Sequence, residues 1–380
     1  MTERLRILLA GMVAGDPRQG GATWAVLQYF LGLRDLGHDV VLVEPVSERQ
    51  ARDPAVVSYF ESLAALEGRA ALLSDSGATV GLPFERLLGF ARGADLLLNV
   101  SGMLRDERLL APIGTRAFLD LDPGFNQVWQ LSGEDMGFDR HTHFVTVGQA
   151  VGAPGCAVPT CGRRWTATLP PVVLERWPAL AARPAGDFTS VGHWRSYGSL
   201  EHGGIRYGQR AHSLRELLEL PALVGERFTL ALGIHPDERG DLEALRRNGW
   251  SLVDPAAVAG SPERYAEFIG GSKAELGVAK SGYVASRSGW FSDRSACYLA
   301  SGRPVVAQDT GFGGALPTGE GLLAFSTVEE AAAAVEEVAR RPDRHSRVAR
   351  ELAEGLFDSR RVLPSLLHEL GAPVDRGRRE

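Results

Sequence analysis

The chain has 380 residues, 45 of them glycine, and this length is too great for one ordinary hydrophobic core, so we expect two domains. Its 41 Lys and Arg residues against 47 Asp and Glu residues give a net charge of -6, without long single-sign blocks. Composition and charge therefore argue against nucleic acid as a partner.

An apolar run at residues 7–10 has the length of a strand and is far too short for a signal peptide or a membrane span. We therefore expect no export and no integral membrane segment. The three cysteines, Cys156, Cys161 and Cys297, are an odd number that does not suggest a disulfide framework. A reduced cytoplasm fits this best, and Cys156 and Cys161 lack the second ligand pair of a zinc site.

The first forty residues indicate a strand, a glycine loop, a helix and a second strand. The loop covers residues 11–21, the helix stops at Gly37, and residues 40–43 follow as a buried strand. This βαβ unit predicts a parallel sheet. Further apolar runs, each followed by a polar or glycine-containing loop as in such a sheet, lie at residues 96–100, 117–121 and 144–147.

Six prolines and little periodicity mark residues 152–187, which we interpret as an interdomain connection. Apolar runs of strand length then return at residues 188–192, 228–233, 250–253, 274–279, 304–308 and 322–325. We predict an α/β fold of two Rossmann-like domains, over residues 1–165 and 188–355, with a linker over 166–187 and a C-terminal helix and tail over 356–380.

Helices are expected to close the second domain. Thr327 and Glu330 have the spacing of a capping box before an alanine- and glutamate-rich helix that runs to about residue 340. Residues 348–356 and 362–370 continue with helical spacing.

The segment from residue 292 to 314 is the most informative part of the chain. Ser292 predicts a helix N-cap and Gly302 a left-handed stop before the next buried strand. Arg294 is unusual, because a cation in the first helical turn opposes the macrodipole at a cost of about 0.3 to 1 kcal/mol. A bound diphosphate would explain it, and an ion pair with Asp293 is the alternative.

These features resemble GT-B glycosyltransferases of the family-1 and family-4 kind. Residues 300–306, Ala-Ser-Gly-Arg-Pro-Val-Val, are similar to the Ala-x-Gly-x-Pro-Val-Val stretch of their donor-binding domain, and residues 294–300 resemble their Arg-Thr-Phe-Glu type of helix. The resemblance implies two domains that face each other across a cleft holding a nucleotide-diphosphate sugar, with residues 1–165 on the acceptor side and residues 188–355 binding the nucleotide sugar. Family-4 enzymes carry two glutamates eight residues apart here, where this chain has Gly289 and Cys297, so those contacts are not carried over.

For the leaving diphosphate we expect Arg294 and the amides beside Ser292 and Asp293. Basic side chains expected to help them are Arg195, Lys280 and Arg287, and the alternative for Lys280 and Arg287 is an ordinary solvated charge.

Two further segments are candidates for sugar contacts. His193 and Trp194 follow the first strand of the second domain, and there they could hydrogen-bond a sugar and stack on its ring. The alternative is a surface loop with an aromatic plug. Asp309, Thr310 and Gly311 follow another strand and could hold sugar or ribose hydroxyls, or form a plain turn.

Two aspartates compete as the general base. Asp16 lies in the loop after the first strand, from which the resemblance implies that inverting GT-B enzymes draw their base. Gly20 and Gly21 immediately precede the expected helix and are candidates for substrate binding. Asp122 ends the 118–122 run and is well placed to take a proton, although Asp-Pro-Gly is also a common turn.

His141 and His143 are two residues apart, which on a strand puts both on one face. They lack a third ligand nearby, so we expect no metal site and interpret the pair as an acceptor contact or a surface patch.

We predict a glycosyltransferase that moves a sugar from a nucleotide-diphosphate sugar to a small-molecule acceptor, as in natural product biosynthesis. No obvious metal motif of the GT-A kind is recognised, so we expect no metal, and no cofactor beyond the sugar nucleotide as co-substrate. A sugar-nucleotide epimerase of the same fold and a non-catalytic nucleotide- or sugar-binding protein are the alternatives. The sugar, the acceptor, the stereochemistry and a homodimer all stay open.

Overall fold

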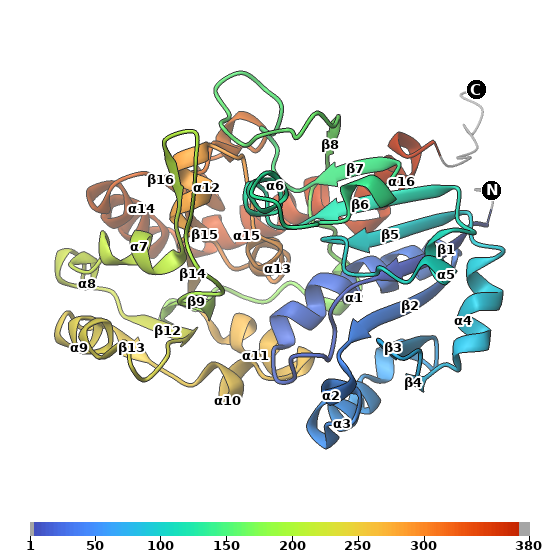
Figure 1. Ribbon diagram of the computed structural model, residues 1–380. Helices are drawn as coiled ribbons and strands as arrows, with labels where there is room; N and C mark the ends of the chain where they lie inside the picture. The colour runs from blue at the N-terminus through green and yellow to red at the C-terminus, as the bar shows by residue number, and fades with distance from the viewer. Residues whose placement is uncertain (1–3, 372–380) are drawn as a thin grey trace, which may run out of the picture.

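The computed structural model describes residues 4–371, whose strands form two largely parallel sheets, one in each half of the chain (Figure 1). The first sheet has the order β4-β3-β2-β1-β5-β6-β7-β8, and all neighbours are parallel except β3 and β4. Its strands are β1 (Arg6–Ala10), β2 (Asp39–Val46), β3 (Ala70–Ser74), β4 (Thr79–Gly81), β5 (Leu96–Val100), β6 (Thr115–Asp120), β7 (His143–Thr146) and β8 (Trp165–Ala167).

The second sheet has the order β13-β12-β9-β14-β15-β16, with every neighbouring pair parallel. Its strands are β9 (Phe188–His193), β12 (Phe228–Gly233), β13 (Ser251–Leu252), β14 (Ala274–Gly277), β15 (Val305–Gln308) and β16 (Leu322–Phe325), and a separate hairpin is formed by β10 (Leu200–His202) and β11 (Ile205–Tyr207). The predicted fold class of two Rossmann-like domains is confirmed. The predicted domain boundaries stay predictions. Strand β8 extends the first sheet to Ala167, beyond the predicted domain boundary at residue 165.

Helices flank both sheets. Those of the first half are α1 (Gly20–Asp35), α2 (Glu48–Ala51), α3 (Pro54–Ser62), α4 (Phe84–Ala91), α5 (Glu107–Leu110) and α6 (Phe125–Leu131). Those of the second half are α7 (Arg210–Arg215), α8 (Leu220–Leu223), α9 (Arg239–Arg247), α10 (Pro255–Ala259), α11 (Pro262–Gly271), α12 (Ser281–Ser286), α13 (Asp293–Ala300), α14 (Val328–Arg340), α15 (Pro342–Leu352) and α16 (Ser359–Glu369). Within residues 4–371 no helix combines the length and hydrophobicity that a transmembrane span requires.

Helix α13 begins and ends where the sequence predicts. The Ser292 hydroxyl accepts a hydrogen bond from the Arg294 backbone N–H at 3.2 Å, and Gly302 adopts a left-handed φ of 67° after the last turn. At α14 the Thr327 hydroxyl caps the Glu330 N–H, but the Glu330 carboxylate accepts from the N–H of Ser326 rather than of Thr327. Both N-caps are confirmed, and the second is a capping box displaced by one residue.

Helix α1 is shared by both halves of the molecule. Figure 1 shows it in the middle, beside α11 of the second domain, and it also packs against the C-terminal helix α16. The Trp24 indole N–H donates to the Pro262 carbonyl at 2.8 Å, and the indole ring lies 5.1 Å from that of Trp177, in the predicted linker. One hydrophobic cluster therefore runs through both domains, including Leu27 of α1, Ile269 of α11 and Leu363 of α16.

Close packing of α1 predicts the effect of adding a single methyl group. A Cβ on Gly32 would lie 2.6 Å from Cδ1 of Leu363 and 2.9 Å from Cβ of Ser359, so Gly32→Ala has to push α16 away. We expect a loss of about 1 to 3 kcal/mol in the free energy of unfolding, measured from urea denaturation.

Gly89 of α4 is the matched control, because it is helical and a Cβ there meets nothing within 4 Å. Gly89→Ala is expected to stabilise the protein by up to about 1 kcal/mol. Equal shifts in the two variants would contradict the packing of α16 on α1.

Candidate functional site

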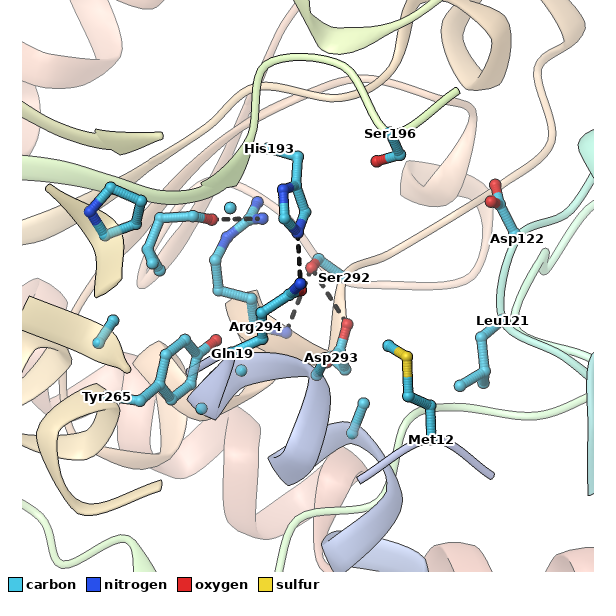
Figure 2. A pocket seen from close by; sticks show the side chains of 18 of the residues that line it. Met12, Gln19, Leu121, Asp122, His193, Ser196, Tyr265, Ser292, Asp293 and Arg294 are labelled. Carbon is cyan, nitrogen blue, oxygen red and sulfur yellow. Dashed lines mark hydrogen bonds between the residues drawn. The ribbon is translucent and has the colours of Figure 1, made fainter. Parts of the chain in front are cut away.

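A cavity of about 620 Å³ lies between the two domains, at the carboxyl ends of the strands of both sheets (Figure 2). Open α/β sheets bind ligands at this edge, and the volume is that of a small-molecule site. Predicted site residues that line it are Gly20, Gly21, Asp122, His193, Lys280, Ser292, Asp293 and Arg294. Predicted site residues outside its lining are Asp16, Trp194, Arg195, Arg287, Asp309, Thr310 and Gly311.

Arg294 lines the cavity, but its main partner is Glu275 of β14. The two side chains form a buried ion pair, and Nη1 of Arg294 donates to the Val191 carbonyl at 3.2 Å. Burial lowers the pKa of Arg294, but the Glu275 carboxylate outweighs this and raises it. The alternative of an ion pair with Asp293 is therefore corrected, because Glu275 is the partner. The predicted contact of Arg294 with a diphosphate stays a prediction, since its side chain also lines the cavity.

Asp122 is held by three side chains of the second domain. Nζ of Lys280 lies 2.9 Å from its Oδ2, and the hydroxyls of Tyr197 and Tyr283 donate to the same carboxylate. Burial lowers the pKa of Lys280, although Asp122 opposes this shift. This Asp122 cluster joins the two domains beside the cavity, and its carboxylate lines the cavity wall.

Asp120 fixes the backbone that presents Asp122. Its carboxylate is completely buried and accepts from the Asp122 N–H at 2.9 Å. It also accepts from the side chains of Asn126, Gln127 and Thr146 at 2.6 to 2.9 Å. Burial raises its pKa to about 6 against the effect of these donors. The sequence analysis missed Asp120. This residue ends the buried strand β6, and its neighbours in the sequence are mostly apolar.

Arg210, the first residue of α7, is the functional candidate that the sequence analysis missed. Its side chain lines the cavity and is only 8% exposed. Its guanidinium donates to the carbonyls of Val278 at 2.9 Å and His193 at 2.8 Å, and no carboxylate within residues 4–371 forms an ion pair with it. Burial, followed by the like charge of Arg294, lowers its pKa to about 9.

A second contact between the domains lies near His193. Its Nε2 is 2.8 Å from Oε1 of Gln19, at the start of α1, and the Gln19 amide donates to Asp16 (Figure 2 shows the first of these contacts). Asp16 itself is exposed and outside the lining, so of the two predicted bases only Asp122 reaches the cavity.

Gly20 and Gly21 line the cavity, yet packing between domains explains why both are glycine. A Cβ on Gly20 would collide with the Ser261 carbonyl, and one on Gly21 would lie 2.8 Å from the Tyr265 ring.

Two predicted contacts in the β9 loop are corrected. The Trp194 ring is 1% exposed and its N–H donates to Asp241 at 3.0 Å, so it cannot stack on a sugar. The aromatic plug, which was the alternative, is what the structure shows. Arg195 forms an ion pair with Glu238 outside the cavity.

The remaining predicted residues lie in turns. Arg287 follows α12 with a left-handed φ of 47°. The Asp309 carboxylate accepts from the Gly311 N–H at 2.9 Å, and the Thr310 hydroxyl donates to the Trp290 carbonyl at 2.6 Å. These local bonds match the alternative of a plain turn, so the predicted ligand contacts of Asp309, Thr310 and Gly311 are not supported by their position.

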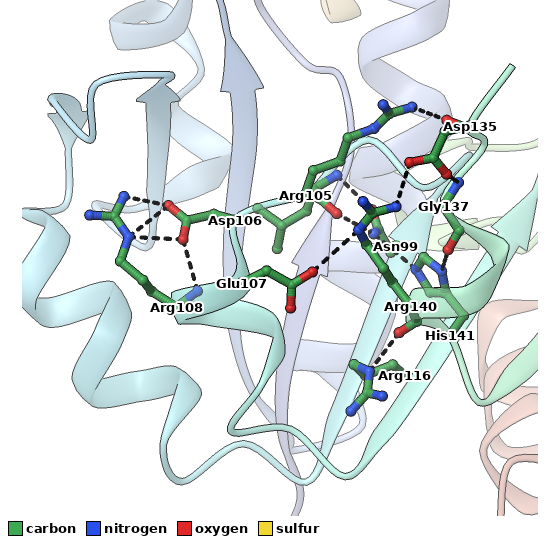
Figure 3. A network of polar contacts seen from close by, with 11 residues as sticks. Asn99, Arg105, Asp106, Glu107, Arg108, Arg116, Asp135, Gly137, Arg140 and His141 are labelled. Carbon is green, nitrogen blue, oxygen red and sulfur yellow. Dashed lines mark hydrogen bonds and ion pairs between the residues drawn. The ribbon is translucent and has the colours of Figure 1, made fainter.

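A polar network at the end of β5 fixes the segment that follows this strand (Figure 3). Asn99 accepts from the Leu104 N–H at 3.0 Å and donates both to the Leu104 carbonyl at 2.9 Å and to Nε2 of His141 at 3.0 Å. Nδ1 of His141 donates to the Gly137 carbonyl, and burial lowers the pKa of this histidine. His141 is therefore neither a surface residue nor a residue of the cavity lining, as its predicted roles required.

The glycine loop after β1 is organised by an internal carboxylate. Glu44 of β2 is 1% exposed and accepts from the backbone N–H groups of Val13, Ala14 and Gly15 at 3.0, 2.8 and 2.7 Å. Successive amides of this kind form a site for an anion, and here the protein fills it itself. Burial raises the pKa of Glu44, and the three N–H donors oppose that shift.

Comparison with known proteins agrees with this architecture. A family model described as glycosyl transferase-like matches residues 234–363, and no curated protein matches. AviGT4, a glycosyltransferase involved in avilamycin A biosynthesis, is 15% identical with a TM-score of 0.60, covering 97% of this chain and 98% of its own.

Two other similar structures contain UDP. Anabaena HepE in complex with UDP and glucose is 12% identical with a TM-score of 0.60, covering 97% of this chain and 100% of its own. An alpha-glucosyltransferase in complex with UDP and DNA is 12% identical with a TM-score of 0.61 at the same coverage. The chain therefore has the GT-B fold, the predicted resemblance is confirmed, and the family match supports an enzyme of the transferase class.

The Glu44 contacts predict a stability effect. In Glu44→Gln one carboxylate oxygen becomes an NH₂ group that faces a backbone N–H, so a buried donor loses its acceptor. We expect a loss of about 1 to 3 kcal/mol in the free energy of unfolding, from urea denaturation.

Glu61→Gln on the exposed face of α3 is the control and is expected to change the free energy of unfolding by less than about 0.5 kcal/mol. If Glu44→Gln is as mild as this control, the carboxylate does not hold the loop.

Proposed function

We propose that the protein is a glycosyltransferase that binds a nucleotide-diphosphate sugar and transfers the sugar to a small molecule without a metal ion. The observation that carries this proposal is Arg210, a buried cation that faces the cavity and has no carboxylate partner within residues 4–371. Two backbone carbonyls satisfy part of its hydrogen bonding but do not neutralise its charge. Since buried charges are costly unless paired, the site is incomplete without an anion.

A diphosphate is the anion that fits best. The guanidinium of Arg210 stays protonated near neutral pH, because its pKa is lowered only to about 9. Planar guanidinium groups bind phosphate oxygens bidentately, and Lys280 and Arg294 line the same cavity. The uncompensated charge of Arg210 would stabilise the charge that develops on the leaving diphosphate, which supports metal-independent transfer.

Asp122 is the proposed general base. It lines the cavity at the end of β6, and its three hydrogen-bonded partners hold the carboxylate in one place. In this scheme an acceptor hydroxyl or amine gives its proton to Asp122 as it attacks the anomeric carbon, and the nucleotide diphosphate leaves toward Arg210. The bond formed joins the acceptor to the sugar, and the bond broken joins the sugar to the diphosphate.

A small-molecule acceptor and a role in natural product biosynthesis are part of the proposal. The volume of the cavity and the involvement of AviGT4 in avilamycin A biosynthesis support them. The net charge of -6 is unfavourable for DNA, which one of the similar structures contains. A cytoplasmic location stays a prediction that rests on the three free cysteines.

The role of Arg210 predicts a loss of nucleotide binding. Arg210→Ala removes charge-assisted hydrogen bonds to the diphosphate, so the affinity for UDP in isothermal titration should fall about ten- to a hundredfold. Arg210→Lys keeps the charge but not the planar fork, so its affinity should lie between those of Arg210→Ala and the wild type.

Arg195→Ala is the control, since this arginine pairs with Glu238 outside the cavity, and it should keep the wild-type affinity for UDP. An Arg210→Ala variant that retains its circular dichroism spectrum and binds UDP as tightly as the wild type would remove the basis of the proposal.

Replacing Asp122 is expected to reduce turnover with little loss of nucleotide binding. Asp122→Asn cannot accept the acceptor's proton, so the rate of UDP release from UDP-sugars should fall about a hundredfold to ten-thousandfold. Asp16→Asn, at an exposed position outside the lining, should stay near the wild-type rate. The opposite pattern would assign the base to Asp16, and unchanged rates in both variants would argue for a mechanism without either aspartate.

A further inference from the structure

The two sides of the cavity differ in polarity. The second-domain side carries Arg210, Lys280 and Arg294, whereas the first-domain side has Arg18 as its basic side chain and presents Met12, Val100, Met103 and Leu121. In Figure 2, Met12 and Leu121 lie on the same side as Asp122, away from Arg294. We use the name apolar wall for Met12, Ala25, Val100, Met103 and Leu121.

The apolar wall follows from the strand order of the first sheet. Met12 comes after β1, Val100 ends β5 with Met103 close behind, and Leu121 follows β6. These three strands are neighbours, so the residues that follow them meet at one edge of the sheet. Ala25 completes the wall from α1.

The side chains of the apolar wall are not all fully buried in the hydrophobic core. Met12, Ala25, Met103 and Leu121 are all half-buried, although they lie between two packed domains. All four line the cavity. Apolar surface in this position is stabilised when an apolar ligand removes it from water.

Two polar groups interrupt the wall along these strand ends. Ser101 lies between Val100 and Met103, and Asp122 follows Leu121. Ser101 has a left-handed φ of 49°, which is uncommon for a residue other than glycine and is maintained here beside the Asn99 network. The wall therefore offers an apolar surface with two polar groups, Ser101 and Asp122, at the strand ends that form it.

We propose that the apolar wall is the acceptor subsite and that the acceptor is a compact apolar molecule with one hydroxyl or amine directed at Asp122. The inference rests on the proposed function and specifies the acceptor class. A free sugar or an oligosaccharide would lose hydrogen bonds to water against Met12, Met103 and Leu121 without replacing them. A polynucleotide would in addition meet the negative charge of the chain.

The test measures binding of two probes by isothermal titration, each with and without UDP. 4-Methylumbelliferone is an apolar phenol, and cellobiose is a polar disaccharide. The full-length protein should bind the phenol and show no heat with cellobiose. Met103→Gln and Met12→Gln keep the side-chain length but add an amide, so each should weaken phenol binding about three- to tenfold.

Two controls establish that a weakened phenol affinity comes from the apolar wall. Leu223→Gln changes a leucine of α8 that is 47% exposed and outside the cavity, and it should leave phenol binding unchanged. The affinity for UDP should be the same in both methionine variants as in the wild type, because neither side chain belongs to the basic side of the cavity.

Binding of cellobiose in place of the phenol, or phenol binding that neither methionine variant weakens, would overturn the acceptor subsite even if UDP binds normally. Phenol binding that depends on Met12 and Met103 in a protein that does not bind UDP would support the apolar subsite and defeat the proposed donor. The two failures are therefore distinguishable.

Discussion

The close packing of helix α1 against α11 and α16 is the constraint on which the architecture depends. Gly20 and Gly21 let its first turn touch α11, and Gly32 lets its later turns touch α16. With larger residues at these positions the helix would stand away from α11, and the cavity between the domains would change shape. This packing allows one hydrophobic cluster to run through both domains.

The basic side chains that line the cavity differ in whether a carboxylate of the protein neutralises them. This difference distinguishes those that stabilise the fold from those available to a ligand. Arg294 and Lys280 have internal carboxylates, Glu275 and Asp122, so their charges are compensated before anything binds. Arg210 has only carbonyl partners within the described residues. Whether a cation is available to a ligand therefore depends on its carboxylate partner more than on its position next to a predicted phosphate site. A cation in a buried ion pair contributes little net attraction for an added anion.

The sequence predicted what depends on short-range signals. The N-cap at Ser292, the stop at Gly302 and the alternation of strands and helices all follow from residues close in the chain, and the structure confirms them. Arg210, Glu44 and Asp120 were missed because their significance comes from burial and from partners that only the fold brings near. For the same reason Trp194 and Asp309 looked available for a ligand, while the structure commits them to internal hydrogen bonds.

The carboxylate of Glu44 has a consequence for the entropy of ligand binding. A loop whose backbone N–H groups have no acceptor in the free protein becomes ordered only when a phosphate binds. The entropy lost by ordering the loop then reduces the binding free energy. Here the amides of Val13, Ala14 and Gly15 are ordered when the chain folds. Met12 next to them is therefore preorganised, and the loop adds no ordering penalty when a molecule enters the cavity.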